Sequence, residues 1–390
     1  MAVLDEPVKL LSDGVLAKIR QMTYWDAIRY DYERPCDWNH GLTDEWGHLP
    51  RLEARRAVLY RAEPDKWGYC HHQQLCYGLG RYFAVWSAGI HHEMHRHQEI
   101  RFSTSSDGLS WSANGRLVAE PETSHDIYQA GALYGCDDYV AAYCNTFIGS
   151  DADEEIRKKG GTAPRGVEIF VTTDGVAWER KGLIGGNLAI HESPRMTSKG
   201  RLVTTADRRS KEPLFLIFEK GPLSPPRVIE FPLPSADLPL HECTWYETGD
   251  GRLWMLFRDE TVSLRLRLSV SEDGGETWSV PVLTNFVDSM SKVFAGRLSD
   301  GRVFVINNAY PQALNRDRLM LSVSRDGKVF DSMFILDDAP SRIRILGYLK
   351  NRGHAYPHAL VHGGKLFVIY STSKEDIRVA AVDLAALGRP

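Results

Sequence analysis

One short phrase occurs four times in this chain, and it constrains the fold more than any other feature of the sequence. This box phrase reads SSDGLSW at Ser105–Trp111, TTDGVAW at Thr172–Trp178, SEDGGETW at Ser271–Trp278 and SRDGKVF at Ser324–Phe330. Its aspartates are 67, 99 and 53 residues apart, so the middle interval has room for a decayed copy, for which FEKGPLSPP from Phe218 is the candidate. A period of about 50–60 residues is typical of a solenoid or a propeller.

The residues around each box phrase predict four β-strands per repeat. An alternating strand precedes the phrase, and upstream of it two apolar strands are joined by a Gly-containing turn, as in residues 131–145 and 292–308. Six such hairpins can be found, and tight turns of this kind favour antiparallel pairing. The sequence therefore predicts an all-β fold, a six-bladed β-propeller with four-stranded antiparallel blades.

The two ends of the chain complete this interpretation. Residues 365–384 supply only three strands for the last blade, whereas residues 53–62 (EARRAVLYRA) are strand-like and precede the first complete hairpin. We expect this N-terminal strand to close the last blade and remove an open sheet edge. Residues 1–50 are then an N-terminal extension, partly helical or irregular, and residues 51–390 a single propeller domain.

The box phrase itself has a structural role. Asp and Ser oxygens can accept hydrogen bonds from backbone N–H groups in a turn, and Gly permits positive φ. The aromatic residue at its end can fill the blade. We therefore expect a turn lock between the third and fourth strands, not a catalytic motif.

Composition excludes several classes of partner. The formal net charge is -4, which gives no basis for binding nucleic acid or an anionic membrane. No apolar run approaches the roughly 18–20 residues that span a bilayer. The first residues, MAVLDEPVKLL, are not a secretion signal, so we expect a cytoplasmic protein unless a leader has been removed. The six cysteines contain no CxxC pair and are expected to be free thiols.

With its four box phrases, the chain resembles the sialidase-like, Asp-box (BNR) β-propeller superfamily over about residues 52–385. Two segments, residues 69–89 (YCHHQQLCYGLGRYFAVWSAG) and 356–377, are similar to parts of propeller polysaccharide lyases and hydrolases that act on uronate-linked glycans. The resemblance implies a carbohydrate-active enzyme with an oligosaccharide or glycan substrate. Pairing of chains is left open.

A true sialidase is less expected. That family uses three arginines, a Tyr–Glu nucleophile pair, an acid/base Asp and an Arg-Ile-Pro segment near the first blade. Here the nearest phrase, SPRMTSKGRLVTTADRR, begins at Ser193 in the third blade, and no acid/base Asp stands out early in the chain. This departure puts sialic acid in doubt as the substrate.

Propeller geometry predicts where a site would lie. The first strand of each blade starts at the axis, on the face opposite the box phrases, and the loops after the second strands surround it. The catalytic candidates on this face are His71, His72, Glu192, Glu242, Tyr356 and His358. The substrate-binding candidates are Gln129, His191, Arg195, Arg208, His241, Arg258, Lys292 and Arg318.

These candidates have structural alternatives. His71 and His72 could cap a strand, and repeat symmetry alone could preserve the pairs His191–Glu192 and His241–Glu242. The run HHEMHRHQ, with His91, His95 and His97, has loose ligand-like spacing, but a loop lacks the fixed geometry of a metal motif on a helix. The sequence therefore predicts neither a metal site nor another cofactor.

Two reactions suit a site rich in His, Tyr, Arg and carboxylates. In hydrolysis, the function expected first, Glu192 and Glu242 are the carboxylate candidates and a histidine the proton donor. In β-elimination at a uronate, His72, Tyr356 or His358 would transfer protons while arginine or lysine holds the carboxylate. An exo-sialidase or a glycan-binding propeller without activity are further alternatives.

Overall fold

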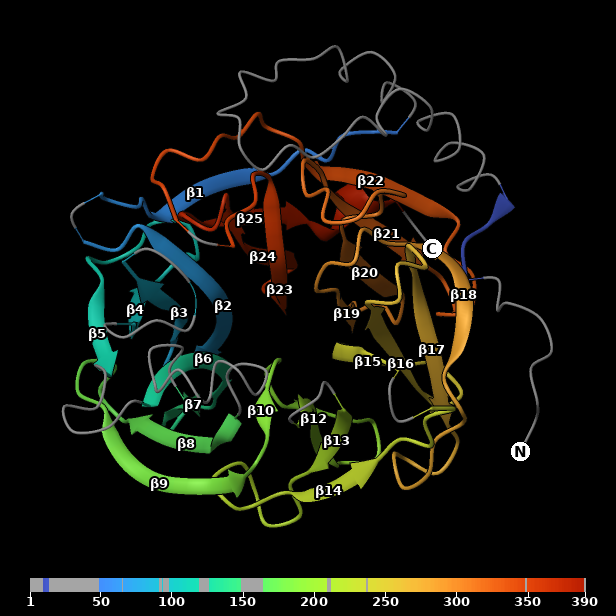
Figure 1. Ribbon diagram of the computed structural model, residues 1–390, viewed down its shortest axis with the longest axis horizontal. Coiled ribbons are helices and arrows are strands. Elements are labelled where there is room, and N and C mark those ends of the chain that lie inside the picture. The colour runs from blue at the N-terminus through green and yellow to red at the C-terminus, as the bar shows by residue number, and fades with distance from the viewer. Residues whose placement is uncertain are drawn as a thin grey trace.

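Six antiparallel sheets stand around one central axis in the computed structural model (Figure 1). The structure describes residues 10–13, 49–64, 66–90, 93, 98–118, 126–148, 164–208, 212–235, 238–347 and 349–388. Each sheet has its first strand next to the axis and its last strand at the rim, except that the rim strand of the last sheet comes from the N-terminal side of the chain. The predicted six-bladed propeller is confirmed.

The blades follow one another along the chain. Blade 1 contains β2 (Tyr69–Gly78), β3 (Arg81–Gly89), β4 (Glu99–Ser105) and β5 (Gly115–Val118). Blade 2 contains β6 (Asp126–Gly135), β7 (Val140–Ile148), β8 (Pro164–Thr172) and β9 (Glu179–Gly186). Blade 3 contains the short inner strands β10 (Ala189–Ile190) and β11 (Arg195–Met196), then β12 (Leu202–Asp207), β13 (Pro213–Ile217) and β14 (Arg227–Glu230).

The second half of the ring has the same order. Blade 4 contains β15 (Leu240–Glu247), β16 (Leu253–Asp259), β17 (Arg265–Ser271) and β18 (Val282–Val287). Blade 5 contains β19 (Phe294–Arg297), β20 (Val303–Asn307), β21 (Leu319–Ser324) and β22 (Ser332–Asp337). Blade 6 contains β23 (His354–His362), β24 (Lys365–Thr372), β25 (Asp376–Asp383) and, at its rim, β1 (Arg55–Tyr60), and a short 3-10 helix η1 (Leu384–Leu387) follows β25.

Strand β1 closes the ring as predicted. It pairs antiparallel with β25, with Arg55 opposite Ala381 and Ala57 opposite Val379. The rim strand of blade 6 therefore comes from a part of the chain that precedes blade 1. This pairing covers the edge of β25 that would otherwise be open to another chain.

The box phrases form turn locks, also as predicted. Asp107 Oδ1 accepts hydrogen bonds from the backbone N–H groups of Leu109 and Ser110 at 2.8 and 2.6 Å. Asp174, Asp273 and Asp326 accept equivalent backbone bonds in their own turns. The decayed copy from Phe218 lies in the corresponding connection of blade 3, between β13 and β14.

Box glycines also tie neighbouring blades together. A Cβ on Gly275 of blade 4 would lie 2.2 Å from Phe215 of blade 3, and one on Gly108 of blade 1 would lie 2.5 Å from Phe367 of blade 6. Both glycines have positive φ, at 95° and 75°. Each box turn is therefore packed against an aromatic ring of the blade next to it, where a larger residue would not fit.

The core consists of apolar wedges between blades, not of one central cluster. One wedge joins Phe83 and Val85 of blade 1 to Leu133 and Phe170 of blade 2, and another joins Phe215 of blade 3 to blade 4. Because apolar side chains fill the spaces between the sheets, the axis is left to the polar residues of the inner strands. The candidate site is therefore expected among the polar side chains at the axis.

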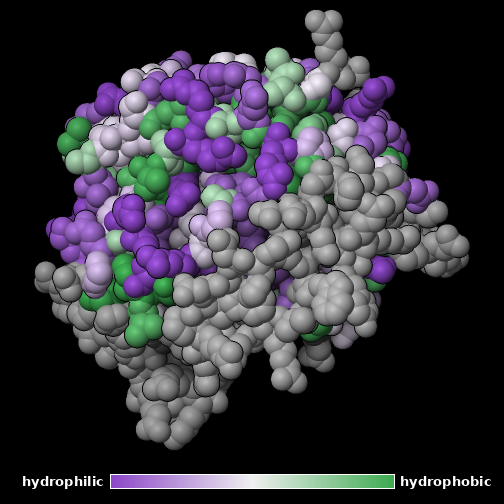
Figure 2. All heavy atoms as spheres, turned by 90° about the horizontal axis from the view of Figure 1, so that it is seen from above, coloured by the Kyte–Doolittle hydropathy of each residue, from purple (hydrophilic) through white to green (hydrophobic). Residues whose placement is uncertain are grey.

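The described parts of the N-terminal extension lie at the rim. Asn285 Oδ1 accepts from the backbone N–H groups of Leu10 and Leu11, and Leu52 N–H donates to the carbonyl of Ile335 on β22 at 2.9 Å. Hydrophilic residues cover much of the described rim in Figure 2, with small hydrophobic groups among them. Among the described residues, no helix is long and apolar enough to cross a membrane. Five of the six cysteines are described and are free thiols, and Cys36 lies outside the described residues.

Candidate active site

Three inner strands carry the same backbone irregularity near their axial starts. The pairing register shifts between His71 and Gln74 in β2, between His241 and Thr244 in β15, and between Ala355 and His358 in β23. Within these bulges His72, Glu242 and Tyr356 have φ values of 56°, 46° and 57°. A left-handed backbone at a residue other than glycine costs about 1–3 kcal/mol and is found most often at functional sites. The three bulges therefore mark an axial site.

Tyr356 lies at the centre of this axial site. Arg258 Nη1 donates to its hydroxyl oxygen at 3.1 Å. The Arg316 guanidinium and the Lys292 ammonium lie 5.4 and 5.7 Å from its ring centroid, and the His71 ring packs on it at 3.9 Å. Burial, followed by the charge of Glu242, raises the pKa of Tyr356 well above its usual value. The resting phenol is therefore neutral and needs a base to lose its proton.

Glu242 is the carboxylate next to this tyrosine. Arg258 Nη1 donates to Glu242 Oε2, and Arg258 Nη2 lies 2.8 Å from Glu260 Oε1. Burial alone would raise the pKa of Glu242, but the charges of Arg258 and His241 outweigh it and hold that pKa well below the usual range. Glu242 is therefore ionised, and Arg258 holds it in place together with Tyr356.

A histidine and carboxylate pair forms the opposite side of the site. His72 Nε2 lies 2.9 Å from Glu93 Oε1 and 3.1 Å from the amide nitrogen of Gln129. The Tyr69 hydroxyl donates to Glu93 Oε2 at 2.9 Å, and Lys374 Nζ lies 3.4 Å from the same oxygen. Burial acts to raise the pKa of Glu93, but Lys374 and His72 hold it well below its usual range. Burial lowers the pKa of Lys374 to about 8.

Arg316 is the residue whose bonding is incomplete. Its side chain comes from the loop between β20 and β21, and the residue is only 2% exposed. Among the described residues, its Nε and Nη1 atoms have no hydrogen-bond partner. A buried guanidinium with unmet N–H groups is costly, because it has given up water without replacing its hydrogen bonds. Arg316 is therefore suited to bind an anion beside Tyr356.

Deeper along the axis, polar side chains from several blades meet. Lys292 Nζ and Gln74 Nε2 both donate to the carbonyl oxygen of His191. Glu192 accepts from the Thr244 hydroxyl at 2.8 Å and lies 3.1 Å from Arg195 Nη2. Burial raises the pKa of Glu192 and lowers that of Lys292. These contacts form a layer of buried polar side chains next to the axial site.

The comparisons with known proteins agree with this architecture. A family model described as BNR repeat-like domain matches residues 80–368. The chain belongs to this family. The curated proteins contain no match to the sequence.

Several solved structures share the fold. A protein of unknown function from Dyadobacter fermentans is 14% identical, with 86% of this chain and 100% of that chain covered and a TM-score of 0.67. An intramolecular trans-sialidase from Ruminococcus gnavus is 14% identical over 86% of this chain and 98% of that one, with a TM-score of 0.64. A Streptococcus pneumoniae sialidase is 12% identical over 85% and 71%, with a TM-score of 0.62. At these identities the likeness shows the fold alone.

The structure brings many of the candidate residues together. His71, His72, Gln129, Glu242, Arg258, Lys292 and Tyr356 are linked by the contacts above. His191 Nε2 lies 2.8 Å from Asp207, and His241 Nε2 lies 2.8 Å from Glu260, so both histidines belong to the ion-pair network next to Arg258. His71 is fully buried, with its Nδ1 bonded to the Ser371 hydroxyl, and it supports Tyr356 from behind.

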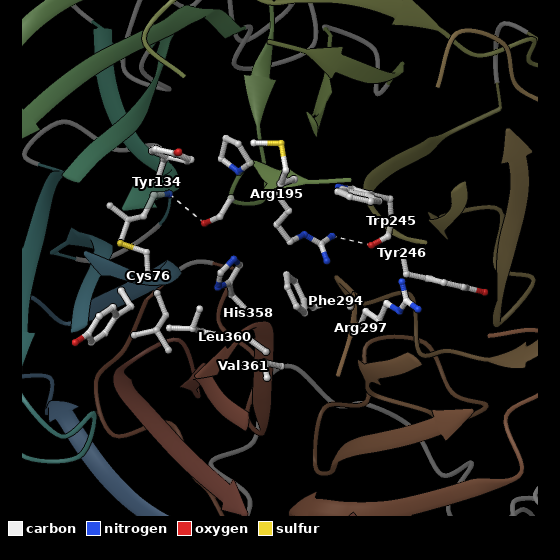
Figure 3. Close-up of a pocket in the computed structure, with 18 of the residues that line it drawn as sticks. Cys76, Tyr134, Arg195, Trp245, Tyr246, Phe294, Arg297, His358, Leu360 and Val361 are labelled. Atoms are coloured by element: carbon white, nitrogen blue, oxygen red, sulfur yellow. Dashed lines mark hydrogen bonds between the residues drawn. The ribbon is translucent and has the colours of Figure 1, made fainter. Parts of the chain in front are cut away.

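Other candidates lie elsewhere. His358 and Arg195 line a cavity at the opposite ends of the inner strands (Figure 3), with Glu192 bonded between them and the axial site. Arg208 pairs with Glu230 on the rim strand β14, and Arg318 lies 4.0 Å from Asp338 beyond β22. His91, His95 and His97 lie outside the described residues.

Sequence reasoning did not select Glu93, Tyr69 or Arg316 as site residues. Glu93 lies within the histidine-rich run that was considered for metal binding, and its partners are far apart in the sequence. Tyr69 lies two residues before His71 on the same strand, so alternation along the strand could have indicated it. Arg316 is one of several polar residues in its loop, and only the structure shows that its nitrogen atoms lack partners.

Proposed function

We propose that this protein is a glycoside hydrolase that cleaves a glycosidic bond at or next to an acidic, uronate-type sugar. The observation that carries the proposal is the buried Arg316, two of whose nitrogen atoms have no hydrogen-bond partner in the described part of the chain and whose guanidinium lies beside Tyr356. A sugar carboxylate would supply the missing acceptors, since a guanidinium binds a carboxylate through two parallel hydrogen bonds. The carboxylates of the site already have partners of their own, so they do not compete for Arg316.

Tyr356 suits the role of nucleophile. A neutral phenol can approach an anionic sugar without the repulsion that a carboxylate nucleophile would meet, and tyrosine serves in this way in some glycosidases. In the first step its oxygen attacks the anomeric carbon as the bond to the departing sugar breaks, and Glu242, which Arg258 holds on the same side as the phenol, accepts the phenol proton directly once the substrate is bound. In the second step water displaces the tyrosine oxygen, and the proton returns to it.

His72 suits the role of acid and base for the leaving group. Its Nε2 atom lies 2.9 Å from Glu93 Oε1 and its Nδ1 atom lies 3.3 Å from the Ser87 hydroxyl, so the departing sugar oxygen would take its proton from the His72–Glu93 pair. The same pair would deprotonate the incoming water in the second step. His71 supports Tyr356 through ring packing and has no part in proton transfer here.

One observation favours β-elimination as a second candidate. The rings of His72 and Tyr356 pack edge to face with their centroids 5.6 Å apart, so the two side chains could act as base and acid from the same side of a uronate. Arg316 and Lys292 would then stabilise the enolate-like anion that forms when the C5 proton leaves. The two reactions use the same residues but give different products, since only elimination creates a conjugated double bond.

The test is a digestion screen on uronate-containing oligosaccharides, with a sialoside included because two of the structural neighbours are named as sialidases. Products are read by mass and by ultraviolet absorbance. Hydrolysis adds the mass of water without new absorbance, whereas elimination adds no water and absorbs. Tyr356→Phe should abolish either reaction. Turnover of the sialoside alone would replace the uronate in the proposal, and no turnover of any substrate by the wild type would leave a glycan-binding propeller.

A further inference from the structure

A second cavity opens at the other end of the inner strands, on the side of the box turns. Its volume is about 490 Å³, within the range of small-molecule sites. Tyr77, Tyr134 and Glu247 line it from the ends of β2, β6 and β15, whereas His72, Gln129 and Glu242 lie near the starts of the same strands. Along β15 its outer lining residue Glu247 is about 16 Å from Glu242 at the usual rise of a strand, whereas His358 at its inner wall is two residues from Tyr356 on β23. This box-side cavity therefore opens at the opposite end of the inner strands, and its inner wall lies next to the axial site.

His358 points to a missing ligand in this cavity. The residue is 2% exposed and lines the cavity wall, and neither of its ring nitrogens has a hydrogen-bond partner among the described residues. Its ring packs on Phe294 with the centroids 4.6 Å apart. Burial, and then the charges of Lys292 and Arg195, lower the pKa of His358 well below its usual value. The neutral ring leaves one donor and one acceptor unmet, which is unusual for a buried polar group.

Arg195 adds a second incomplete group to the same wall. Its guanidinium lies 4.6 Å from the Trp245 ring and 5.0 Å from the Phe294 ring, and its two Nη atoms donate to backbone carbonyls and to Glu192. Its Nε atom and Trp245 Nε1 have no hydrogen-bond partner among the described residues. Figure 3 shows Arg195, Phe294 and His358 near the middle of the cavity. The cavity wall thus contains aromatic rings and, next to them, N–H groups of Arg195 and Trp245 without hydrogen-bond partners among the described residues.

The hydrogen-bonding groups left unmet in the cavity favour an anion. Arg195 and Arg297 both line it, and Arg297 is exposed at its mouth. The one lining carboxylate, Glu247, already accepts from the backbone N–H and the hydroxyl of Ser198. Glu192, behind the wall, is bonded to Thr244 and Arg195. The free hydrogen-bonding capacity is therefore mainly that of donors, beside two positive charges.

We infer that the box-side cavity is a second carbohydrate site, which binds one acidic monosaccharide unit by its carboxylate. The half-buried rings of Tyr77 and Tyr134 line the cavity beside the sugar, and Arg195, Arg297 and His358 supply polar contacts. The site binds and does not cleave, because Glu247 is the one carboxylate among the described residues that line the cavity, whereas glycosidic cleavage generally needs a pair of acid and base or nucleophile groups. The ligand class is argued from this cavity alone and does not depend on the reaction at the axial site.

Calorimetric titration with glucuronic acid, with glucose as the neutral control, tests this inference. Arg316→Ala is used as the background, because it removes the carboxylate contact of the axial site. In that background glucuronic acid should still bind, and glucose should bind at least tenfold more weakly. Adding Arg297→Glu should weaken glucuronic acid binding at least tenfold. The matched change Arg325→Glu, an exposed arginine in a box turn that does not line the cavity, should leave it unchanged.

A second variant tests the buried wall. His358→Leu removes the two unmet ring nitrogens and should weaken binding, while its unfolding midpoint stays at or above that of the Arg316→Ala background, because no hydrogen bond within the protein is lost. The inference is overturned if the Arg316→Ala protein does not bind glucuronic acid, or if Arg297→Glu and Arg325→Glu have equal effects. Failure of cleavage by the wild type would affect the proposed function only, since this test measures binding in a protein whose axial site is disabled.

Discussion

Gly275→Ala should destabilise the protein by more than the backbone conformation alone explains. Gly275 belongs to the box turn of blade 4, has a φ of 95°, and packs on the Phe215 ring of blade 3. A methyl group would lie 2.2 Å from Phe215 Cε1, and Phe215 is fully buried, so the ring cannot move away freely. Positive φ at alanine costs about 1–3 kcal/mol, and overpacking adds about 1–3 kcal/mol more.

Gly221→Ala separates these two contributions. Gly221 has a nearly equal φ of 91°, but a Cβ there would meet nothing within 4 Å. Equilibrium unfolding in urea, followed by tryptophan fluorescence, gives both free energies from the midpoints and slopes. Trp278, whose ring is 5.0 Å from Phe215, is a reporter beside the altered turn. If the two variants lose the same stability, the box turns do not hold neighbouring blades together as described.

Two further predictions concern the axial site, and a third concerns the buried carboxyl group of Asp288. Arg316→Ala should lower kcat/KM on an acidic substrate by about 10–150-fold, as expected for about 1.5–3 kcal/mol of charged hydrogen bonding, and Arg316→Lys, which keeps only the charge, should recover part of the loss at most; equal losses on acidic and neutral substrates in initial-rate assays would argue against a carboxylate contact. His72→Ala should lower turnover by about 10²–10⁴-fold with little change in the thermal midpoint, and unchanged turnover would remove His72 from the mechanism. Burial raises the pKa of Asp288 to about 6 from 3.8, so the folded state holds this proton more tightly and stability should fall as pH rises from about 4 to 6, by about 3 kcal/mol at most. Asp288→Asn should remove this decrease when the urea midpoint of unfolding is plotted against pH. If the variant shows the same decrease as the wild type, Asp288 is not its cause.

The fold could be predicted because the box turns depend on local chemistry. An Asp, a Gly and an aromatic residue at fixed spacing specify the turn regardless of the rest of the chain, and the Phe218 segment kept its place in blade 3 after losing the phrase. What the pattern did not show is the break in the inner strand of blade 3, where β10 and β11 are separated by His191–Pro194. Pro194 has no N–H group to donate to a sheet, so this strand is interrupted.

The axial site was predicted only in part, because its depth is set by the bulges. Tyr356 and His358 are two residues apart in the sequence, yet the structure places one in the axial site and the other in the box-side cavity. Alternation along a strand tells which side chains face the axis but not at what level they lie. None of the three left-handed positions, His72, Glu242 and Tyr356, is a glycine. The bulges therefore had no marker in the sequence.

The pairing of β1 with β25 has a consequence for how the molecule is made. Residues 55–60 leave the ribosome before any blade exists, but their partner, residues 376–383, follows only after all the strands from β2 to β24. Until then β1 has no partner strand and is able to pair with a neighbouring polypeptide. Ring closure therefore waits until residues 376–383 have emerged, and a chain released before residue 376 keeps an open strand and is inclined to aggregate.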